Sequence, residues 1–190
     1  MCNEYQRNVP IAEIEREFAR LKIPLSFPEG RPNLGDTSIR ITDTGTIIRV
    51  SEEQPGTAEL VQRRWSWPGP TGKPVFNYRS DNREFGKGRC LILASGFYEF
   101  TGEKGKKEKW LFTKSDEPWF GIAGLWRTDE KVGEAFTMLT SEPGPDVAPY
   151  HDRQVAVLDR TQWQQWLGPA ARVKGLPGPL PEGTLQVQRV

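Results

Sequence analysis

The sequence predicts an α+β fold: a single compact domain over residues 1–190, with a predominantly antiparallel, barrel-like β-sheet core and a few short flanking helices. Three observations predict it. A chain of 190 residues is long enough for one well-buried core and short for two domains. Between residues 24 and 157 most apolar segments have strand length and are bounded by turn residues. A helical pattern stands at each end of that strand-rich region.

The first element is a short amphipathic helix expected over residues 10–21. Ile11, Ile14, Phe18 and Leu21 recur at helical spacing, acidic residues stand in the first turn, and a proline follows shortly after the end.

Strands are then expected in segments rich in β-branched, aromatic and other apolar residues, namely 46–50, 90–93, 109–112, 120–123 and 135–139. A last short helix is expected through residue 167, capped by Asp159 or Thr161. A Pro- and Gly-rich surface return, 168–183, then leads into a final strand, 184–190.

Composition narrows the classes of function. The sequence has no run of eighteen apolar residues and no secretory leader pattern, so we expect neither a membrane span nor export. Two cysteines and one histidine provide no disulfide framework and no metal-ligand cluster, so no metal and no cofactor are expected. We expect a monomer in the cytoplasm, acting near the nucleoid, or in the nucleus of a compartmented cell.

The charge balance limits how nucleic acid could be bound. The formal net charge is +1, which is not typical of a protein that coats nucleic acid electrostatically. A DNA partner would therefore need a local basic groove. The seven Trp, nine Phe and four Tyr suit a β-rich core and also stacking on bases.

Cys2 follows the initiator Met1, and its small side chain favours removal of that methionine. The product would be a 1,2-aminothiol whose amine has a reference pKa near 7.7–8.0 and whose thiol has one near 8.5. Such an amine condenses with an aldehyde to a Schiff base, and the thiolate can then close a five-membered thiazolidine. The alternative is that Cys2 is an accident of a frayed terminus.

Five stretches resemble the signatures of one family in the same order. They are 76–81 (FNYRSD, against N-A-R-S-E), 89–100 (RCLILASGFYEF, against R-C-[LI]-x-P-[AC]-x-G-[FY]-Y-E-W), 121–126 (GIAGLW, against F-A-G-L-W), 136–140 (FTMLT, against F-T-I-L-T) and 150–158 (YHDRQVAVL, against I-H-x-R-M-P-x-[IV]-L). With the Met-Cys start, the chain resembles a divergent member of the SRAP family, the SOS response-associated peptidase-like proteins that process and shield abasic sites.

The resemblance implies an enzyme of the DNA damage response. Its partner would be single-stranded DNA containing abasic sites, which it would crosslink through a thiazolidine between Cys2 and the ring-opened sugar aldehyde. The resemblance also implies that Asn77 holds the amine and the adduct, that Glu99 acts as acid and base, and that His151 assists ring opening and proton transfer. A sheltered carboxylate and a histidine both suit proton transfer near neutral pH.

Five residues are expected to contact DNA. The resemblance places Arg79 on the DNA backbone, and Arg7 and Arg153 are further candidates for a phosphate track. Trp65 and Trp67 could stack on bases or wedge against a duplex end, with core burial an equal alternative for Trp67.

Simpler alternatives stay open for the catalytic set and Arg79. His151 could be structural, Glu99 could face solvent at a turn, and Arg79 could be a surface ion-pair partner. An acidic Glu4 also stands where the family pattern has none, so it could repel phosphate or shift the amine.

Two other functions are compatible with the same residues. An amino-terminal-nucleophile peptidase or amidase would use Cys2 against a carbonyl, and it would need donors for an oxyanion. A non-covalent single-strand-binding module would use only the aromatic and arginine side chains.

Overall fold

The computed structural model describes residues 1–103, 105–169, 172–176 and 178–190. Over these ranges the elements follow one another as β1 (Glu4–Arg7), α1 (Ile11–Arg20), β2 (Leu25–Ser26), β3 (Thr37–Arg40), β4 (Thr44–Val50), β5 (Ala58–Trp65), β6 (Trp67–Pro68), β7 (Pro74–Val75), β8 (Asn77–Arg79), β9 (Arg89–Ala94), β10 (Gly96–Thr101), β11 (Glu108–Lys114), β12 (Phe120–Asp129), β13 (Gly133–Ser141), β14 (Gln154–Val155), β15 (Val157–Leu158), α2 (Arg160–Trp166) and β16 (Leu185–Arg189).

The core is a closed ring of strands. β13, β12, β9, β4 and β5 are antiparallel neighbours in that order, and β5 then returns to β13 through a parallel pairing of Ala135 with Arg64 and of Phe136 with Trp65. The predicted α+β fold with a predominantly antiparallel, barrel-like core is confirmed.

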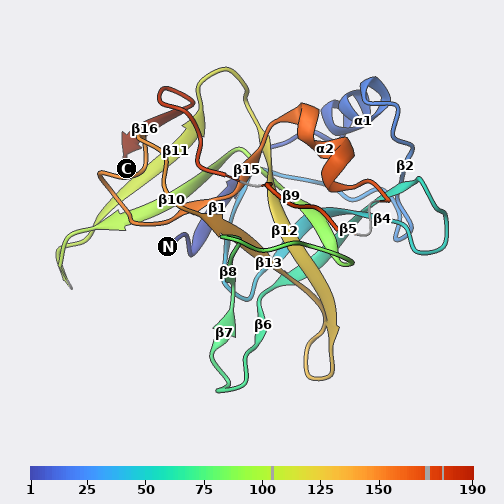
Figure 1. Ribbon diagram of the computed structural model, residues 1–190, viewed down its shortest axis with the longest axis horizontal. Coiled ribbons are helices and arrows are strands. Elements are labelled where there is room, and N and C mark those ends of the chain that lie inside the picture. The colour runs from blue at the N-terminus through green and yellow to red at the C-terminus, as the bar shows by residue number, and fades with distance from the viewer. Residues whose placement is uncertain (104, 170–171, 177) are drawn as a thin grey trace.

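A second antiparallel sheet stands beside the barrel, with strand order β16-β11-β10-β1-β3 (Figure 1). A single residue, Ser95, separates the end of the barrel strand β9 from the start of β10, so the chain passes directly from barrel to sheet. Gly96 permits this passage, because a Cβ there would stand 2.7 Å from Leu111 Cδ1 and 3.0 Å from the Phe112 carbonyl oxygen.

The strand β9 is apolar on both faces because both are buried. Cys90, Ile92 and Ala94 belong to the cluster inside the barrel, whereas Leu91 and Leu93 pack outside it under the helices. Successive side chains of a strand point to opposite faces, so a barrel wall covered by helices requires such a continuous apolar run.

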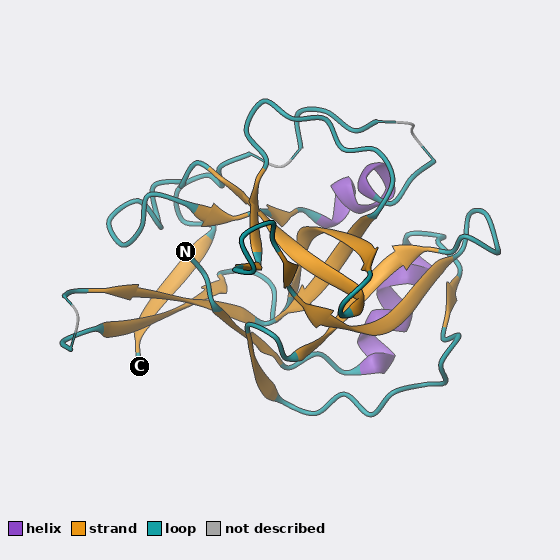
Figure 2. Ribbon diagram, turned by 90° about the horizontal axis from the view of Figure 1, so that it is seen from below, coloured by secondary structure: helices purple, strands orange, loops and turns teal. Residues whose placement is uncertain are grey.

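Both helices lie on the outer wall of the barrel, close together on one side of the molecule (Figures 1 and 2). Phe18 of α1 packs against Trp163 of α2, with ring centroids 5.8 Å apart. The first predicted helix is confirmed. For the second, Asp159 is the N-cap and its backbone N–H donates to Gln162 Oε1, whereas Thr161 lies inside the helix.

The five predicted strands are present within the longer strands β4, β9, β11, β12 and β13, and the final strand, expected over 184–190, is present as the shorter β16. The predicted surface return falls partly outside the described residues, since it includes 170, 171 and 177. Among the described helices, neither is long and apolar enough to cross a membrane.

Candidate active site

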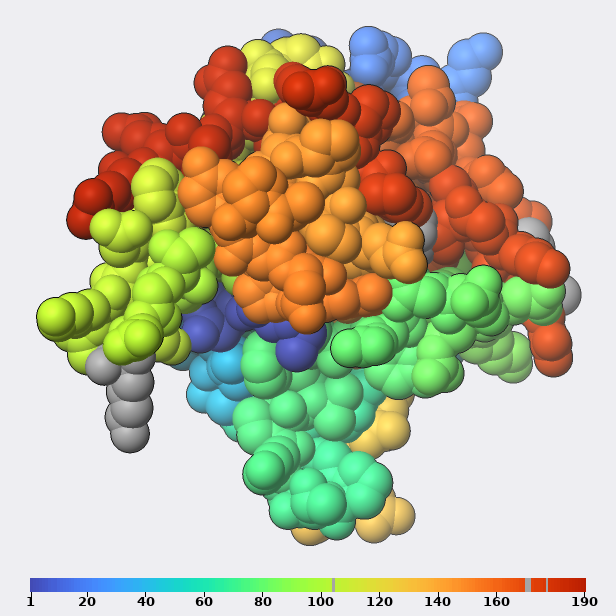
Figure 3. Space-filling model, turned by 60° about the vertical axis from the view of Figure 1, so that its left-hand side comes forward, coloured from blue at the N-terminus to red at the C-terminus, as the bar shows by residue number. Residues whose placement is uncertain are grey.

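Cys2 lies buried at the edge of the barrel interior. Its side chain is 1% exposed, whereas Met1 before it is 46% exposed, so the chain enters the interior between these two residues. β1 anchors this entry by pairing with β10, with Tyr5 opposite Phe97. In Figure 3 the N-terminal residues emerge in a seam between an orange segment near residue 150 and a green segment near residue 77. The frayed-terminus alternative for Cys2 is therefore wrong.

Glu99 approaches the terminus from β10. Its side chain is 1% exposed, and Oε2 lies 3.1 Å from the Met1 amino nitrogen. Burial raises the pKa of Glu99 to about 7, against the opposing effects of the terminal ammonium and the Cys2 backbone N–H. Among the described residues neither carboxylate oxygen has a well-directed hydrogen-bond donor. The solvent-facing alternative is wrong, and the carboxyl group is able to give or take a proton near neutral pH.

Asn77 approaches from another direction on β8, which pairs parallel with β13 so that Asn77 stands opposite Met138. Its side-chain Nδ2 donates to the Cys2 carbonyl oxygen at 2.8 Å. The other amide atom, Oδ1, is buried and has no hydrogen-bond partner in the described part of the chain. One half of the amide thus fixes Cys2, and the other half is available to a group that donates.

His151 completes the convergence from the loop between β13 and β14. Its Nε2 is in contact with the Met1 amino nitrogen. On the other side of the ring, Nδ1 accepts a hydrogen bond from the Arg153 backbone N–H at 2.9 Å and lies 2.9 Å from Asp152 Oδ1. Nε2 is the ring nitrogen that faces the terminus. Burial and the terminal ammonium lower the pKa of His151, which favours the neutral ring.

The thiol of Cys2 is held in its protonated form. Burial raises its pKa well above the ordinary value, and the charge of Glu99 raises it further. The Sγ atom contacts the Glu4 carbonyl oxygen at 3.2 Å as a donor. We call Cys2, Asn77, Glu99 and His151 the Cys2 site. The structure thus brings together all four residues predicted as catalytic.

The residues predicted to contact DNA are placed differently from one another. Arg79, at the end of β8, is exposed, and it makes no ion pair with a described residue. Trp65 is fully buried, packs edge-on against Tyr5 and donates from Nε1 to the Phe76 carbonyl at 2.9 Å. In this structure the Trp65 ring is therefore inaccessible to a nucleobase. It holds the backbone of the residue before Asn77 instead.

Trp67, Arg7 and Arg153 are also buried. The Arg127 guanidinium lies 4.4 Å from the ring centre of Trp67, which is 7% exposed. Arg7 donates to Thr46 Oγ1 at 2.8 Å. All three side chains lie in the interior, so their predicted contact with DNA stays a prediction.

Arg153 has a structural task beside His151. Its guanidinium donates to the Thr140 carbonyl at 2.7 Å and pairs with Asp81 at 2.6 Å. These contacts tie the His151 loop to β13 and to the turn after β8. Sequence reasoning missed Asp81 because this pairing joins segments 72 residues apart.

Glu4 does not face the Cys2 site as a free charge. Its carboxylate accepts from Lys109 Nζ at 2.9 Å and from the Ser38 hydroxyl, and Arg40 lies 3.7 Å away. These partners lower the pKa of Glu4 against the opposing effect of its burial. The expectation that Glu4 would repel phosphate or displace the amine is corrected, because its charge is compensated within the second sheet.

Two aromatic side chains at the Cys2 site were not predicted as functional. Trp110 stands opposite Glu99 in the β10–β11 pairing, and Tyr150 directly precedes His151. The available signal was alternation along residues 108–114, which puts Trp110 on the same face as Phe112.

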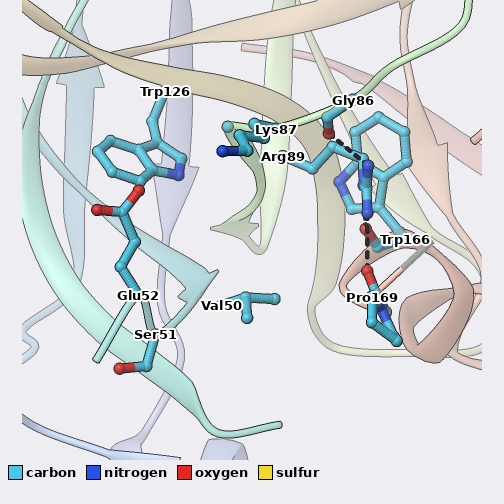
Figure 4. A pocket seen from close by; sticks show the side chains of 11 residues that line it. Val50, Ser51, Glu52, Gly86, Lys87, Arg89, Trp126, Trp166 and Pro169 are labelled. Atoms are coloured by element: carbon cyan, nitrogen blue, oxygen red, sulfur yellow. Dashed lines mark hydrogen bonds between the residues drawn. The ribbon is translucent and has the colours of Figure 1, made fainter. Parts of the chain in front are cut away.

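A cavity of about 630 Å³ lies elsewhere, between the start of β9, the middle of β12 and the end of α2. Trp126, Lys87 and Glu52 line it (Figure 4). The guanidinium of Arg89 closes one side, held by the Trp166 and Gly168 carbonyls at 2.7 Å each. None of the four residues of the Cys2 site lines this cavity.

Comparisons with known proteins place the chain in a family. A family model described as SOS response associated peptidase (SRAP) matches residues 1–190. The chain is 31% identical over 103 residues to the abasic site processing protein HMCES of Gallus gallus, an alignment that covers 42% of this chain and 31% of that protein. It is 27% identical over 104 residues to the abasic site processing protein YMR114C of Saccharomyces cerevisiae, covering 49% of this chain and 28% of that protein.

Another curated relative carries a different name. The chain is 35% identical over 91 residues to peroxynitrite isomerase 1 of Rhodococcus jostii, covering 46% of this chain and 48% of that protein. Each of these alignments thus spans less than half the length of the curated relative it matches.

The fold recurs in solved structures. A protein from Bordetella bronchiseptica shares it with a TM-score of 0.74 at 23% identity, covering 100% of this chain and 99% of that chain. A protein from Bacteroides thetaiotaomicron shares it with a TM-score of 0.76 at 19% identity, covering 100% and 92%. At these identities the likeness concerns the fold alone.

Proposed function

Because the chain belongs to the SOS response associated peptidase (SRAP) family, we propose that it processes abasic sites in single-stranded DNA by a covalent crosslink to Cys2. The chicken and yeast relatives are named abasic site processing proteins, which supports the substrate. The observation that carries the proposal is the convergence of Glu99, Asn77 and His151, from three separate segments, on the backbone of Met1 and Cys2.

The reactive form is the chain without Met1. Its removal turns the Cys2 nitrogen from an amide into an amine, beside a thiol on the same residue. The Asn77 bond to the Cys2 carbonyl fixes this residue, so the amine and the thiol are held together on one small fragment. The Cys2 nitrogen is also near the Glu99 carboxyl, since its N–H already lowers the pKa of that group.

Attack of the amine on the C1′ aldehyde of the ring-opened sugar forms a C–N bond, and the carbonyl oxygen takes up a proton. Loss of that oxygen as water requires another proton and leaves an imine. A carboxyl group with a pKa of about 7 can accept the proton of the amine and return it to the departing hydroxyl. Neutral His151, with Nε2 directed at the terminus, takes the same role for the sugar oxygen during ring opening.

Closure of the ring completes the reaction. The Cys2 sulfur adds to the imine carbon, and the thiol proton passes to the imine nitrogen, which gives a thiazolidine. The balance is one aldehyde and one aminothiol converted to one thiazolidine and one water, with no oxidant or reductant. Burial raises the pKa of this thiol in the folded protein, which favours its neutral form.

Met1 occupies the position that the adduct would take. Its carbonyl carbon is bonded to the Cys2 nitrogen as C1′ would be, and its amino nitrogen lies two bonds further out. That outer atom contacts Glu99 and His151. The two groups therefore lie beside an atom two bonds beyond the C1′ position, which supports their assignment to proton transfer on the sugar.

The DNA strand would lie across the exposed part of the seam. Arg79 is the exposed member of the predicted DNA-binding set, and a guanidinium suits a phosphate because its planar fork can make two hydrogen bonds. The buried Trp65, Trp67, Arg7 and Arg153 would act by supporting the site from within.

A thiol peptidase is less well supported by the same site. Such an enzyme needs a thiolate and donors for an oxyanion. Here burial and Glu99 raise the pKa of the thiol, and the Asn77 amide N–H already donates to the Cys2 carbonyl.

Cys2→Ser separates the two halves of the proposed chemistry. The variant keeps the amine and loses the thiol, so it should form an imine that survives denaturation only after borohydride reduction. The wild-type protein should give a heat-stable adduct without reduction. A Cys2→Ser adduct as stable as that of the wild type would contradict the thiazolidine. An oligonucleotide carrying a tetrahydrofuran spacer, which has no aldehyde, is the control.

A further inference from the structure

Trp110 and Tyr150 form an aromatic pair beside the Cys2 site, since Trp110 stands opposite Glu99 and Tyr150 precedes His151. Their ring centroids are 4.9 Å apart at an interplanar angle of 59°. Both rings are half-buried and pack against the cluster that fills the barrel interior. Beneath them, Phe112 is fully buried and contacts Tyr150 edge-on at 5.3 Å.

The strand pairing places this pair directly beside the acid/base groups. In the β10–β11 ladder Glu99 stands opposite Trp110, and Phe97 stands opposite Phe112. Directly opposed residues of an antiparallel pair share one face of the sheet. Phe97 and Phe112 are stacked at 5.1 Å in the core, and Glu99 and Trp110 form the next step outward, where Trp110 becomes partly exposed.

The Trp110 ring is also held in one orientation. Its Nε1 donates to Thr101 Oγ1 at 2.8 Å, and Thr101 lies on the same face of β10 as Glu99. A ring that is fixed by a hydrogen bond, backed by Tyr150 and partly open to solvent is a rigid surface on which a flat group can stack. Bases stack on such aromatic platforms whatever their sequence, because each base has a π-face.

We propose that Trp110, backed by Tyr150, stacks the nucleobase next to the abasic site and so positions the sugar at Cys2. This inference rests on the proposed function and assigns a further specificity residue to it. At an abasic site the neighbouring base has lost one stacking partner. An aromatic ring beside Glu99 and His151 would replace that partner and hold the strand while the aldehyde reacts.

The test removes either the ring or the base. Trp110→Ala and Trp110→Phe are compared with the wild type on two oligonucleotides. In one, the abasic site is flanked by normal nucleotides, and in the other by tetrahydrofuran spacers, which lack both base and aldehyde. Trp126→Ala is the matched control, because Trp126 is a half-buried tryptophan of the separate cavity (Figure 4).

Adduct rates are measured at DNA concentrations below saturation. On the first oligonucleotide Trp110→Ala should be slower by about tenfold, the scale of one lost base–aromatic stack, and Trp110→Phe should keep most of the rate. On the second, Trp110→Ala and the wild type should react equally. Trp126→Ala should match the wild type on both. Equal slowing of Trp110→Ala on both oligonucleotides, or no slowing on either, would overturn the assignment.

Affinity separates this inference from the proposed function. The same oligonucleotides are titrated against Cys2→Ala and against Cys2→Ala with Trp110→Ala. A wild type that gives no adduct contradicts the crosslinking proposal. Even then, stacking is supported if Trp110→Ala lowers the affinity for the oligonucleotide with flanking bases and leaves the affinity for the one with flanking spacers unchanged. If Trp110→Ala changes neither affinity, stacking is rejected.

Discussion

Glu99 is a buried carboxyl group with few hydrogen-bond partners among the described residues. It is 1% exposed, and burial raises its pKa to about 7 from an ordinary value of 4.5. Between pH 4.5 and pH 7 the folded protein therefore keeps a proton on Glu99 that the unfolded chain has already released. Stability contributed at this position is present below pH 4.5 and is lost as pH rises towards 7, so the charged group destabilises the fold above neutrality.

Glu99→Gln should remove this penalty. The variant and the wild type should have nearly equal free energies of unfolding at pH 4.5, where Glu99 is largely neutral. At pH 8 the variant should be more stable by roughly 3 kcal/mol, because each unit of pKa shift corresponds to about 1.4 kcal/mol. Urea denaturation at the two pH values measures this, with the exposed Glu103→Gln as control. A pH-independent difference would contradict the raised pKa.

Asn77 is expected to matter for the rate and little for the fold. Asn77→Ala removes the hydrogen bond to the Cys2 carbonyl and should slow adduct formation by about tenfold, the value of one hydrogen bond that positions a reactive group. Single-turnover adduct rates measure this, with the exposed Asn33→Ala as the matched control. A normal rate in Asn77→Ala would remove the residue from its assigned role.

At the scale of elements, local patterns allowed α1 and the strands β4, β9, β11, β12 and β13 to be predicted, because spacing and apolar runs report burial directly. β9 is an example, since its apolar run required a wall buried on both faces. The β5–β13 closure and the β8–β13 pairing could not be read from the sequence. They join segments about 60 to 70 residues apart, and periodicity carries no information about partners.

The contrast between local sequence patterns and pairings of distant segments also explains which site residues could be predicted. Cys2, Asn77, Glu99 and His151 carry reactive groups within a resemblance in sequence, so their types and order were informative. The burial of Trp65 and Arg153 follows from the closure of the barrel and from contacts with Phe76 and Asp81. A tryptophan or arginine looks the same in a sequence whether it lies inside or on a DNA-binding surface.

Arg89 links two elements that support the barrel wall. Its guanidinium donates to the carbonyls of Phe85, Gly86, Trp166 and Gly168, which ties the loop before β9 to the end of α2. A cation at a helix C-terminus also offsets the partial negative charge of the last carbonyls.

Arg89→Ala should lower the free energy of unfolding by roughly 3 kcal/mol, because it leaves several carbonyls without their donor. Chemical denaturation measures the loss, and Arg79→Ala, which truncates an exposed side chain, should change stability by less than about 0.5 kcal/mol. Equal stabilities of the two variants would show that the Arg89 contacts do not hold these elements together.

At the scale of the whole molecule, the net charge of +1 leaves little general attraction for DNA. Binding should therefore depend on a few local phosphate contacts and show a shallow dependence on salt. A protein of this kind would recognise the lesion through its reactive site more than through its affinity for the backbone.

Arg79→Ala tests this view of the interface. If Arg79 contacts one phosphate of a single strand, the slope of log affinity against log salt should become shallower by about 0.7 in the variant. Fluorescence anisotropy with a labelled abasic oligonucleotide, in a Cys2→Ala background, measures the slope. The same slope with and without Arg79 would take this residue off the DNA.

Intact mass spectrometry can detect directly whether Cys2 without Met1 captures an abasic site as a thiazolidine. The purified protein is incubated with a single-stranded oligonucleotide carrying one abasic site, and then heated. We expect a species with the mass of the Met1-less chain plus the oligonucleotide minus one water, absent in Cys2→Ala and in a chain that retains Met1. No adduct from a chain shown to lack Met1, or an equal adduct from Cys2→Ala, would contradict it.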